Sequence, residues 1–158
     1  MEQSVRFYTE SEEETVRFGR MIGEHAADGL FLALIGDLGT GKTHFVQGLA
    51  AGLGIEGAVT SPTFTIMNYY DGALPLKHFD FYRLDDEEEL YNIGWEEYSA
   101  GGVTVAEWAD LFPGVIPPEA VTVRLEAESE TRRRITVSWG DRAPAAVTKE
   151  IETYALGH

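Results

Sequence analysis

Apolar and polar residues at the start of the chain predict one strand followed by one helix. Residues 4–8 alternate with the period of a half-buried strand. Ser11 and Glu14 have capping-box spacing, in which the serine hydroxyl accepts from the amide of Glu14 and the glutamate carboxylate reaches back. Apolar residues then recur every four positions, at Phe18, Ile22 and Ala26. We expect a helix that stops near Gly29, because glycine is favoured just after helix C-termini.

A second strand and helix pattern follows directly. Residues 30–35 are apolar at every position, as in a central strand of a parallel sheet that is buried on both faces. After a glycine-rich turn, residues 42–53 have a helical pattern that Gly54 can close. The apolar face of this helix consists of Phe45, Val46, Leu49 and Leu53. The pattern therefore predicts a buried strand, a tight turn and an amphipathic helix.

Beyond residue 58 the pattern is mainly that of strands. Residues 64–70 and 74–82 are strand candidates, and the Asp71-Gly72 pair between them is a turn signal, so the two can form a hairpin. Asp85 can cap a short acidic helix. A short strand over residues 103–106 ends at Glu107.

The last third predicts an antiparallel pair and a less defined tail. Residues 121–126 and 134–139 alternate and can pair with each other. The residues after 140 are weakly patterned and predict either a short helix near residues 147–154 or a mobile tail. We therefore expect one domain over residues 1–140 and a C-terminal tail over residues 141–158.

Composition narrows the class of protein. The 158 residues include 27 acidic and 12 basic side chains, and the net charge of −15 disfavours strong, independent nucleic-acid binding. The absence of cysteine excludes disulfides and thiolate chemistry and fits a reducing compartment. No apolar run approaches the roughly 20 residues of a spanning helix, and the N-terminus lacks signal-peptide features. We expect a cytoplasmic protein that has no membrane association.

The turn between the second strand and its helix matches a phosphate-binding loop (P-loop) at every fixed position. Its residues are Gly36, Asp37, Leu38, Gly39, Thr40, Gly41, Lys42 and Thr43. The glycines let successive backbone amides point at phosphate oxygens, and the helix N-terminus adds partial positive charge. Lys42 can neutralise the β- and γ-phosphates, and the hydroxyl of Thr43 can ligate Mg²⁺. We expect nucleotide binding within a single α/β P-loop domain, with a mainly parallel sheet, antiparallel additions and helices on both faces.

Two acids at predicted strand ends are candidates for the magnesium site that a P-loop needs. Asp80 follows the sequence Leu-Lys-His-Phe, and Glu107 follows Val-Thr-Val-Ala. Either can hold Mg²⁺ directly or through water, and either can instead be a solvated carboxylate. The sequence leaves this choice open.

Four motifs in this order resemble the bacterial TsaE (YjeE) family of P-loop ATPases, which act in the formation of threonylcarbamoyladenosine on tRNA. They are GDLGTGKT at residues 36–43, TSPTF at 60–64, HFDFYRL at 78–84 and EWAD at 107–110. The resemblance covers about residues 5–139. The sequence departs from the family pattern at His44, where a threonine is common, and at Ala109-Asp110, where Pro-Glu is frequent.

The resemblance implies an activity, cofactors, partners and site residues. The family binds ATP with Mg²⁺ on the residues equivalent to Thr43 and Glu107, while Asp80 lies near the metal and is important for activity. Lys42, Asp80 and Glu107 are therefore the expected catalytic residues. The resemblance also implies a switch loop containing Thr60, Ser61 and Thr63, and a threonine near the adenine, which is Thr9 or Thr15. The implied partners are the transferase TsaD and its companion TsaB.

Several residues and two other functions stay open. His78 can orient Asp80 or transfer protons, or can simply pack as a neutral histidine; Arg83 can act as an internal arginine finger or pair with nearby acids. Trp108 can stack near nucleotide or partner, or belong to the core. The basic run Arg132–Arg134 is more typical of a turn than of RNA binding. A small-molecule kinase and a nucleotide-dependent assembly switch are the alternative functions.

Overall fold

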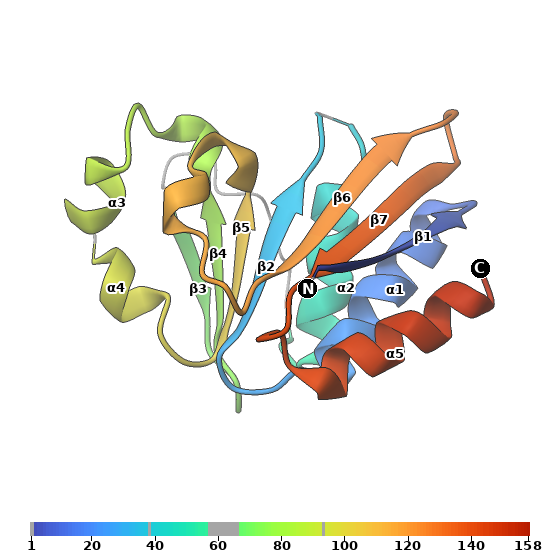
Figure 1. The fold of residues 1–158 in the computed structure, drawn as a ribbon, viewed down its shortest axis with the longest axis horizontal. Helices are drawn as coiled ribbons and strands as arrows, with labels where there is room; N and C mark the ends of the chain where they lie inside the picture. Colours follow the sequence, from blue (N-terminus) through green and yellow to red (C-terminus); the bar gives the residue numbers. More distant parts are fainter. Residues whose placement is uncertain (1, 38, 57–66, 93) are drawn as a thin grey trace.

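The computed structural model describes residues 2–37, 39–56, 67–92 and 94–158. Seven strands form one sheet in the order β1-β7-β6-β2-β5-β4-β3 (Figure 1). They are β1 (Gln3–Thr9), β2 (Leu30–Ile35), β3 (Met67–Tyr70), β4 (Leu76–Asp80), β5 (Val103–Glu107), β6 (Val121–Ala127) and β7 (Arg133–Trp139). The central strands β6, β2, β5 and β4 are parallel to one another. At one edge β3 pairs antiparallel with β4. At the other edge β7 pairs antiparallel with β6, and β1 pairs antiparallel with β7. This arrangement confirms the predicted α/β class.

Helices cover both faces of the sheet (Figure 1). One face carries α1 (Glu12–Glu24), α2 (Lys42–Gly52) and α5 (Ala145–Leu156). The other carries α3 (Glu88–Asn92), α4 (Trp95–Tyr98) and three short 3-10 helices, η1 (Phe81–Arg83), η2 (Ala109–Leu111) and η3 (Pro113–Val115). None of the described helices has the length and apolar character needed to cross a membrane.

Each face of the sheet has its own hydrophobic core. Alternate β2 residues Leu30, Leu32 and Leu34 face α1 and α2, whereas Phe31 and Ala33 face the other side. On that second side, Trp95 of α4 packs edge-on against Phe31, Phe79 and Phe81. The predicted double burial of residues 30–35 is confirmed, because β2 lies in the middle of both cores.

The helices α1 and α2 approach each other closely through glycines. A Cβ atom added at Gly19 would lie 2.2 Å from the carbonyl oxygen of Phe45, and one added at Gly48 would lie 2.0 Å from that of Val16. Backbone therefore packs directly on backbone at this crossing. Since α2 begins at the P-loop, this contact fixes the position of the loop on the sheet.

The beginning of α1 agrees with the prediction, and its end does not. Ser11 is the N-cap and its hydroxyl accepts from the amide of Glu14 at 3.2 Å, but the Glu14 carboxylate reaches the amide of Glu10 rather than that of Ser11. The helix ends at Glu24, so the predicted stop at Gly29 is wrong. Gly29 instead has a φ of 93° in the turn before β2, where its amide donates to Gly102.

The hairpin of β3 and β4 is confirmed, but two local details differ. β4 ends at Asp80 rather than Tyr82, because the Asp80 carboxylate accepts from the amide of Tyr82 and starts a 3-10 helix. The acidic helix α3 begins at Glu88, three residues after the expected cap at Asp85. The part of the predicted strand before Met67 lies outside the described residues.

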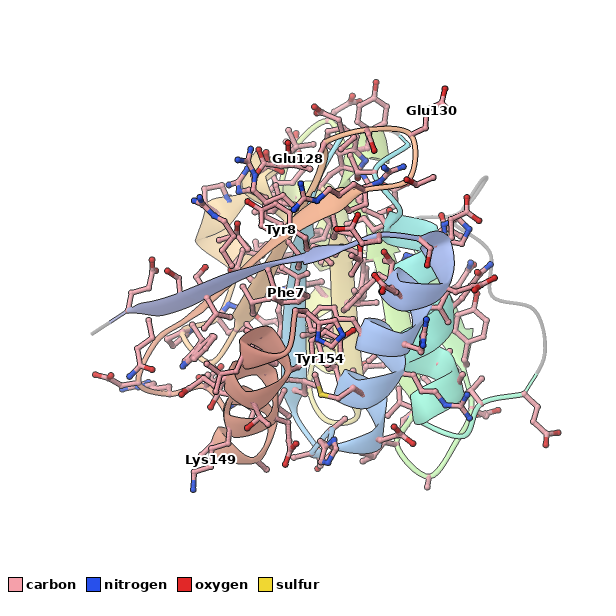
Figure 2. The ribbon with its side chains drawn as sticks, turned by 90° about the vertical axis from the view of Figure 1, so that its right-hand side faces the viewer. Phe7, Tyr8, Glu128, Glu130, Lys149 and Tyr154 are labelled. Atoms are coloured by element: carbon pink, nitrogen blue, oxygen red, sulfur yellow. The ribbon has the colours of Figure 1, made fainter. Side chains whose placement is uncertain are left out.

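Residues 141–158 contain the helical alternative of the two predicted for them. Val147 and Ile151 of α5 are fully buried in the same core as the sheet and α1. The ring of Tyr154 lies 5.3 Å from that of Phe7 and 5.2 Å from that of Phe18, between β1 and α1 (Figure 2). α5 thus supplies one wall of the core.

Candidate active site

The P-loop lies between the carboxyl end of β2 and the start of α2, as the motif predicted. Gly39 and Gly41 have φ values of 80° and 98°, which L side chains rarely adopt. Gly41 is the N-cap of α2, and its carbonyl accepts the first helical hydrogen bond from Phe45. This backbone geometry places the amides of the loop at a helix N-terminus, where an anion is favoured.

The carbonyl oxygens of the loop are held by identifiable donors. The Lys42 ammonium donates to Gly36 at 2.6 Å, and the Thr40 hydroxyl donates to Asp37 at 2.8 Å. The guanidinium of Arg133, at the start of β7, donates to the carbonyls of Gly39 and Thr40. The sequence did not suggest this role for Arg133, because 93 residues separate it from Thr40 and no local pattern links them.

Lys42 is buried and is surrounded by groups that favour its charge. Its Nζ lies 4.0 Å from Oε1 of Glu107 and 3.9 Å from the centre of the Trp108 ring. Burial lowers the pKa of Lys42 below the ordinary 10.5, and the carboxylates of Glu107, Asp80, Asp37 and Asp110 oppose that shift. The ammonium therefore lies at the strand ends, where hydrogen bonds to a phosphate would compensate for part of the water that it loses on burial.

Asp80 and Glu107 are direct register partners at the ends of the parallel strands β4 and β5. Paired residues of neighbouring strands point to the same face, which here is the face that carries α2. Glu107 is buried, whereas Asp80 is half-buried and its carboxylate accepts from the Tyr82 amide at 3.0 Å. The structure thus brings both predicted acids to the carboxyl ends of the parallel strands, where the P-loop also lies.

These donors fit Mg²⁺ that is shared with a nucleotide. Mg²⁺ takes hard oxygen ligands and commonly uses one or two carboxylates, completing its shell with phosphate oxygens and water. Thr43 stands in the first turn of α2 and offers a hydroxyl, and Glu107 and Asp80 offer carboxylates. In the described part of the chain, no three His, Asp or Glu side chains gather as a metal site. The residues that would hold Mg²⁺ here are Thr43, Glu107 and Asp80.

His78 supports Glu107 rather than Asp80. It is fully buried on β4, and its Nε2 contacts Oε2 of Glu107. Alternation along β4 puts His78 on the same face as Asp80, and its register partner is Val105, two residues before Glu107 on β5. The packed, hydrogen-bonded alternative for His78 therefore holds, with Glu107 as its partner.

Trp108 has a backbone conformation that is rare for its residue type. Its φ of 58° is the one positive value among the described non-glycine residues, and such a conformation costs roughly 1–2 kcal/mol. The turn sets the indole against the Lys42 ammonium, and the ring of the exposed Tyr82 lies 4.9 Å away. Trp108 therefore belongs to the site and lies at the margin of the second core.

Thr9 and Thr15, the two candidates for an adenine contact, lie together. Their hydroxyl oxygens are 2.9 Å apart and buried, at the junction of β1 and α1. Thr15 also lies beside the loop, because a Cβ added at Gly41 would be 3.8 Å from its Cγ2. The structure thus places Thr15 beside the P-loop and Thr9 in contact with Thr15, and either role at the adenine stays a prediction.

Some predicted residues fall outside what the structure describes. Leu38 of the P-loop and the switch residues Thr60, Ser61 and Thr63 lie outside the described ranges, as does the side chain of Arg83. A cavity of about 470 Å³ lies between the P-loop and β6 and is bordered by Gly36, Asp37, Trp108 and Leu125. A volume of this size is within the range of small-molecule sites.

Comparison with known proteins gives consistent matches. The model of the family described as "Threonylcarbamoyl adenosine biosynthesis protein TsaE" matches residues 9–135, a span that includes the P-loop and both strand-end acids. The chain is 41% identical over 135 residues to the tRNA threonylcarbamoyladenosine biosynthesis protein TsaE of Treponema pallidum, covering 85% of this chain and 100% of that protein. It is 42% identical over 136 residues to the protein of the same name from Bacillus subtilis, covering 85% of each. The crystal structure of Bacillus subtilis YdiB superposes with a TM-score of 0.76 and 32% identity, covering 98% of both chains.

Proposed function

This chain belongs to the TsaE family, and we propose that it binds ATP with Mg²⁺ and hydrolyses it in support of threonylcarbamoyladenosine formation on tRNA. The partners that we propose are the transferase TsaD and its companion TsaB. The family assignment rests on the match over residues 9–135. The activity, the metal and the partners are inferred from the site chemistry and from the motifs.

The observation that carries the proposal is the position of Lys42. Its buried ammonium lies at the P-loop, 4.0 Å from a carboxylate that ends the neighbouring strand β5. A cation and an acid in this arrangement can meet the two components of Mg·ATP, because lysine attracts the phosphates and the acid attracts the metal. Loop amides at a helix N-terminus supply further phosphate donors.

Each residue has a distinct proposed role in hydrolysis. Lys42 exchanges the Gly36 carbonyl for the β- and γ-phosphates and stabilises charge that develops on them. Thr43 and Glu107 would hold Mg²⁺, which when bound would neutralise phosphate charge. His78 orients the Glu107 carboxylate. Asp80 orients the water that attacks the γ-phosphorus as the bond to ADP breaks.

Titration of a fluorescent ATP analogue, together with phosphate release, tests the proposal. Lys42→Ala should weaken binding by about ten- to a hundredfold, because a charge-assisted contact to phosphate is typically worth roughly 1.5–3 kcal/mol. Lys149→Ala, which removes an exposed lysine from α5, is the control and should bind as the wild type does. Unchanged affinity and turnover in Lys42→Ala would refute nucleotide binding at this loop.

The same measurements separate the alternative functions. A small-molecule kinase would transfer the γ-phosphoryl group to an acceptor rather than release free phosphate. An assembly switch would support tRNA modification even when hydrolysis is abolished by a substitution that leaves ATP binding intact. We expect phosphate release, and loss of tRNA modification when hydrolysis is lost.

A further inference from the structure

Arg133 joins the turn between β6 and β7 to the outside of the P-loop. Its Nε donates to the carbonyl of Thr40 at 3.1 Å, and one terminal nitrogen donates to the carbonyl of Gly39 at 3.2 Å. The other terminal nitrogen donates to the carbonyls of Ser129 at 2.7 Å and Arg132 at 3.1 Å. Four contacts thus engage the planar guanidinium, which has five N–H donors in a fixed geometry. The side chain connects two segments that are far apart in sequence.

The contact determines where the loop amides point. In a trans peptide the carbonyl of one residue and the N–H of the next lie in one plane and point in opposite directions. Holding the carbonyls of Gly39 and Thr40 against Arg133 therefore turns the amides of Thr40 and Gly41 away from it. These are amides that a P-loop presents to phosphate.

The glycine conformations make such a restraint useful. Gly39 and Gly41 lack a Cβ and have φ values of 80° and 98°, so each can also adopt other backbone conformations at little cost. An unrestrained loop would populate conformations in which its amides do not converge. Affinity falls in proportion to the population of the binding-competent conformation.

We propose that Arg133 is a positioning residue that holds the P-loop in its phosphate-binding conformation from outside, without touching the nucleotide. The inference rests on the proposed binding of ATP at this loop. It assigns a specific task to one arginine of the basic run, which the sequence predicted to be a turn and of which Arg133 and Arg134 belong to β7. The task depends on the forked geometry of the side chain as well as on its charge.

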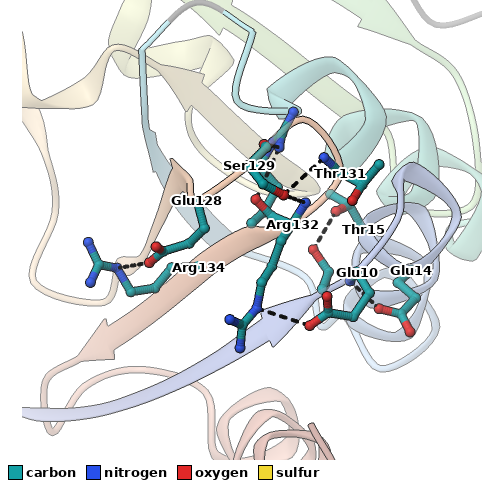
Figure 3. Close-up of polar contacts among 10 residues, drawn as sticks. Glu10, Glu14, Thr15, Glu128, Ser129, Thr131, Arg132 and Arg134 are labelled. Atoms are coloured by element: carbon teal, nitrogen blue, oxygen red, sulfur yellow. Dashed lines mark hydrogen bonds and ion pairs between the residues drawn. The ribbon is translucent and has the colours of Figure 1, made fainter.

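Arg132 provides a matched control, because it neighbours Arg133 and carries the same charge. Its Nε contacts the Glu10 carboxylate at 3.0 Å (Figure 3). Its guanidinium carbon lies 4.0 Å from the centre of the Tyr8 ring. Arg132 thus contacts β1, whereas Arg133 contacts the loop. A general electrostatic effect on ATP would be similar for both residues, and a restraint on the loop is specific to Arg133.

Three variants test the inference: Arg133→Gln, Arg133→Lys and Arg132→Gln. Isothermal titration with ATP and with ADP should show about a tenfold loss of affinity in Arg133→Gln, as expected when the competent conformation falls to roughly a tenth of the population. Arg133→Lys should recover only part of that loss, since one ammonium cannot reproduce the fork. Arg132→Gln should bind within about twofold of the wild type.

A second readout separates positioning from a structural role. At saturating ATP the single-turnover hydrolysis rate of Arg133→Gln should equal that of the wild type, because the loss is confined to binding. Amide hydrogen exchange at Thr40 and Gly41 in the nucleotide-free protein should be faster in Arg133→Gln than in Arg132→Gln.

The outcomes are distinguishable. Wild-type binding of ATP combined with unchanged affinity in Arg133→Gln would overturn the inference and leave the proposed function standing. Equal losses in Arg132→Gln and Arg133→Gln would also overturn it, in favour of a general effect of charge. A wild-type protein that bound no ATP would refute the proposed function, and this inference with it.

Discussion

At the scale of single residues, the site combines groups whose positions are set by different elements. Lys42 belongs to α2, Glu107 ends β5 and His78 lies on β4, and the three are connected by direct contacts. A contact at each side of the Glu107 carboxylate restrains its orientation, which is what a ligand for a hard cation needs. Asp80 is held differently, by the backbone amide of Tyr82. The two acids should therefore differ in function although they are register partners.

We expect Glu107→Gln and Asp80→Asn to separate binding from hydrolysis. An amide is a poorer Mg²⁺ ligand than a carboxylate, so Glu107→Gln should weaken the Mg²⁺-dependent part of ATP binding. Asp80→Asn should keep most ATP affinity and lose hydrolysis, as expected for an interaction made mainly in the transition state. Titrations with and without Mg²⁺, together with single-turnover hydrolysis, measure both effects. The reverse pattern would exchange the two roles.

Lys77 is a second buried lysine, away from the P-loop, and its burial should make the stability of the protein depend on pH. It is 3% exposed, and its ammonium contacts the carbonyls of Ala100 and Gly101. Burial lowers its pKa below 10.5, while the Asp28 carboxylate opposes the shift. Between the folded-state pKa and 10.5 the unfolded chain binds more protons than the folded one, so the stability of the wild type should rise with pH in that window.

Replacing Lys77 with methionine tests this direction, because methionine fills similar space without a charge. Urea unfolding of wild type and Lys77→Met from pH 8 to 10.5 gives the difference in unfolding free energy. That difference should shift in favour of the wild type as the pH rises. A flat difference would mean that the folded protein holds Lys77 at its ordinary pKa.

At the scale of elements, the crossing of α1 and α2 controls the placement of the P-loop. Gly19 and Gly23 on α1 meet the backbone of α2, and Gly48 and Gly52 on α2 meet the backbone of α1. Each pair is spaced four residues apart and so lies on one helix face. A side chain at this contact would push α2 away from α1 and so move the helix N-terminus on which the loop depends.

We expect Gly48→Ala to be destabilising, although alanine normally favours a helix by about 0.8–1 kcal/mol over glycine. The added Cβ would lie 2.0 Å from the carbonyl oxygen of Val16, and overpacking of this kind typically costs roughly 1–3 kcal/mol. ATP affinity should fall as well. Ala51→Gly, at an exposed position of the same helix, should cost only about 1 kcal/mol and leave ATP affinity unchanged. Denaturant unfolding measures both changes, and a stabilised Gly48→Ala variant would contradict the close crossing.

At the scale of the whole molecule, the chain is acidic and carries few cations at its site. The net charge is −15, and in the described part of the chain the arginine that contacts the P-loop is Arg133, whose donors engage backbone carbonyls. Such a surface repels tRNA at long range, and Lys42 alone supplies limited charge for the transition state. Both properties suit a protein that acts through partners.

We therefore expect slow hydrolysis by the isolated protein and faster hydrolysis with the TsaD–TsaB pair. An arginine supplied in trans increases the rates of other P-loop enzymes by about 10³–10⁵. Phosphate release measured with and without the pair tests this, and Lys42→Ala with the pair gives the background rate. Equal rates with and without the partners would argue against activation.

Filter binding should detect no strong association of tRNA with the isolated protein at physiological salt.

Local patterns in the sequence were sufficient for the strand–loop–helix unit and for the two strand-end acids. The unit comprises β2, the P-loop and α2, and its continuous apolar run, its glycines and its helix start can all be recognised within a few neighbouring residues. Asp80 and Glu107 end parallel strands, which meet at one edge of a sheet whatever the rest of the chain does. The motifs also predicted the family correctly.

Contacts between distant segments were decided only by the tertiary structure. Arg133 reaches Thr40 across 93 residues, His78 pairs with Glu107 across 29, and Trp108 turns its ring onto Lys42. Helix α5 likewise buries Val147 and Ile151 although the sequence of the tail is weakly patterned. Periodicity reports which face of an element is buried, but not which side chain of another element lies opposite. That choice follows from strand order and helix crossing, through which the chain assembles its site.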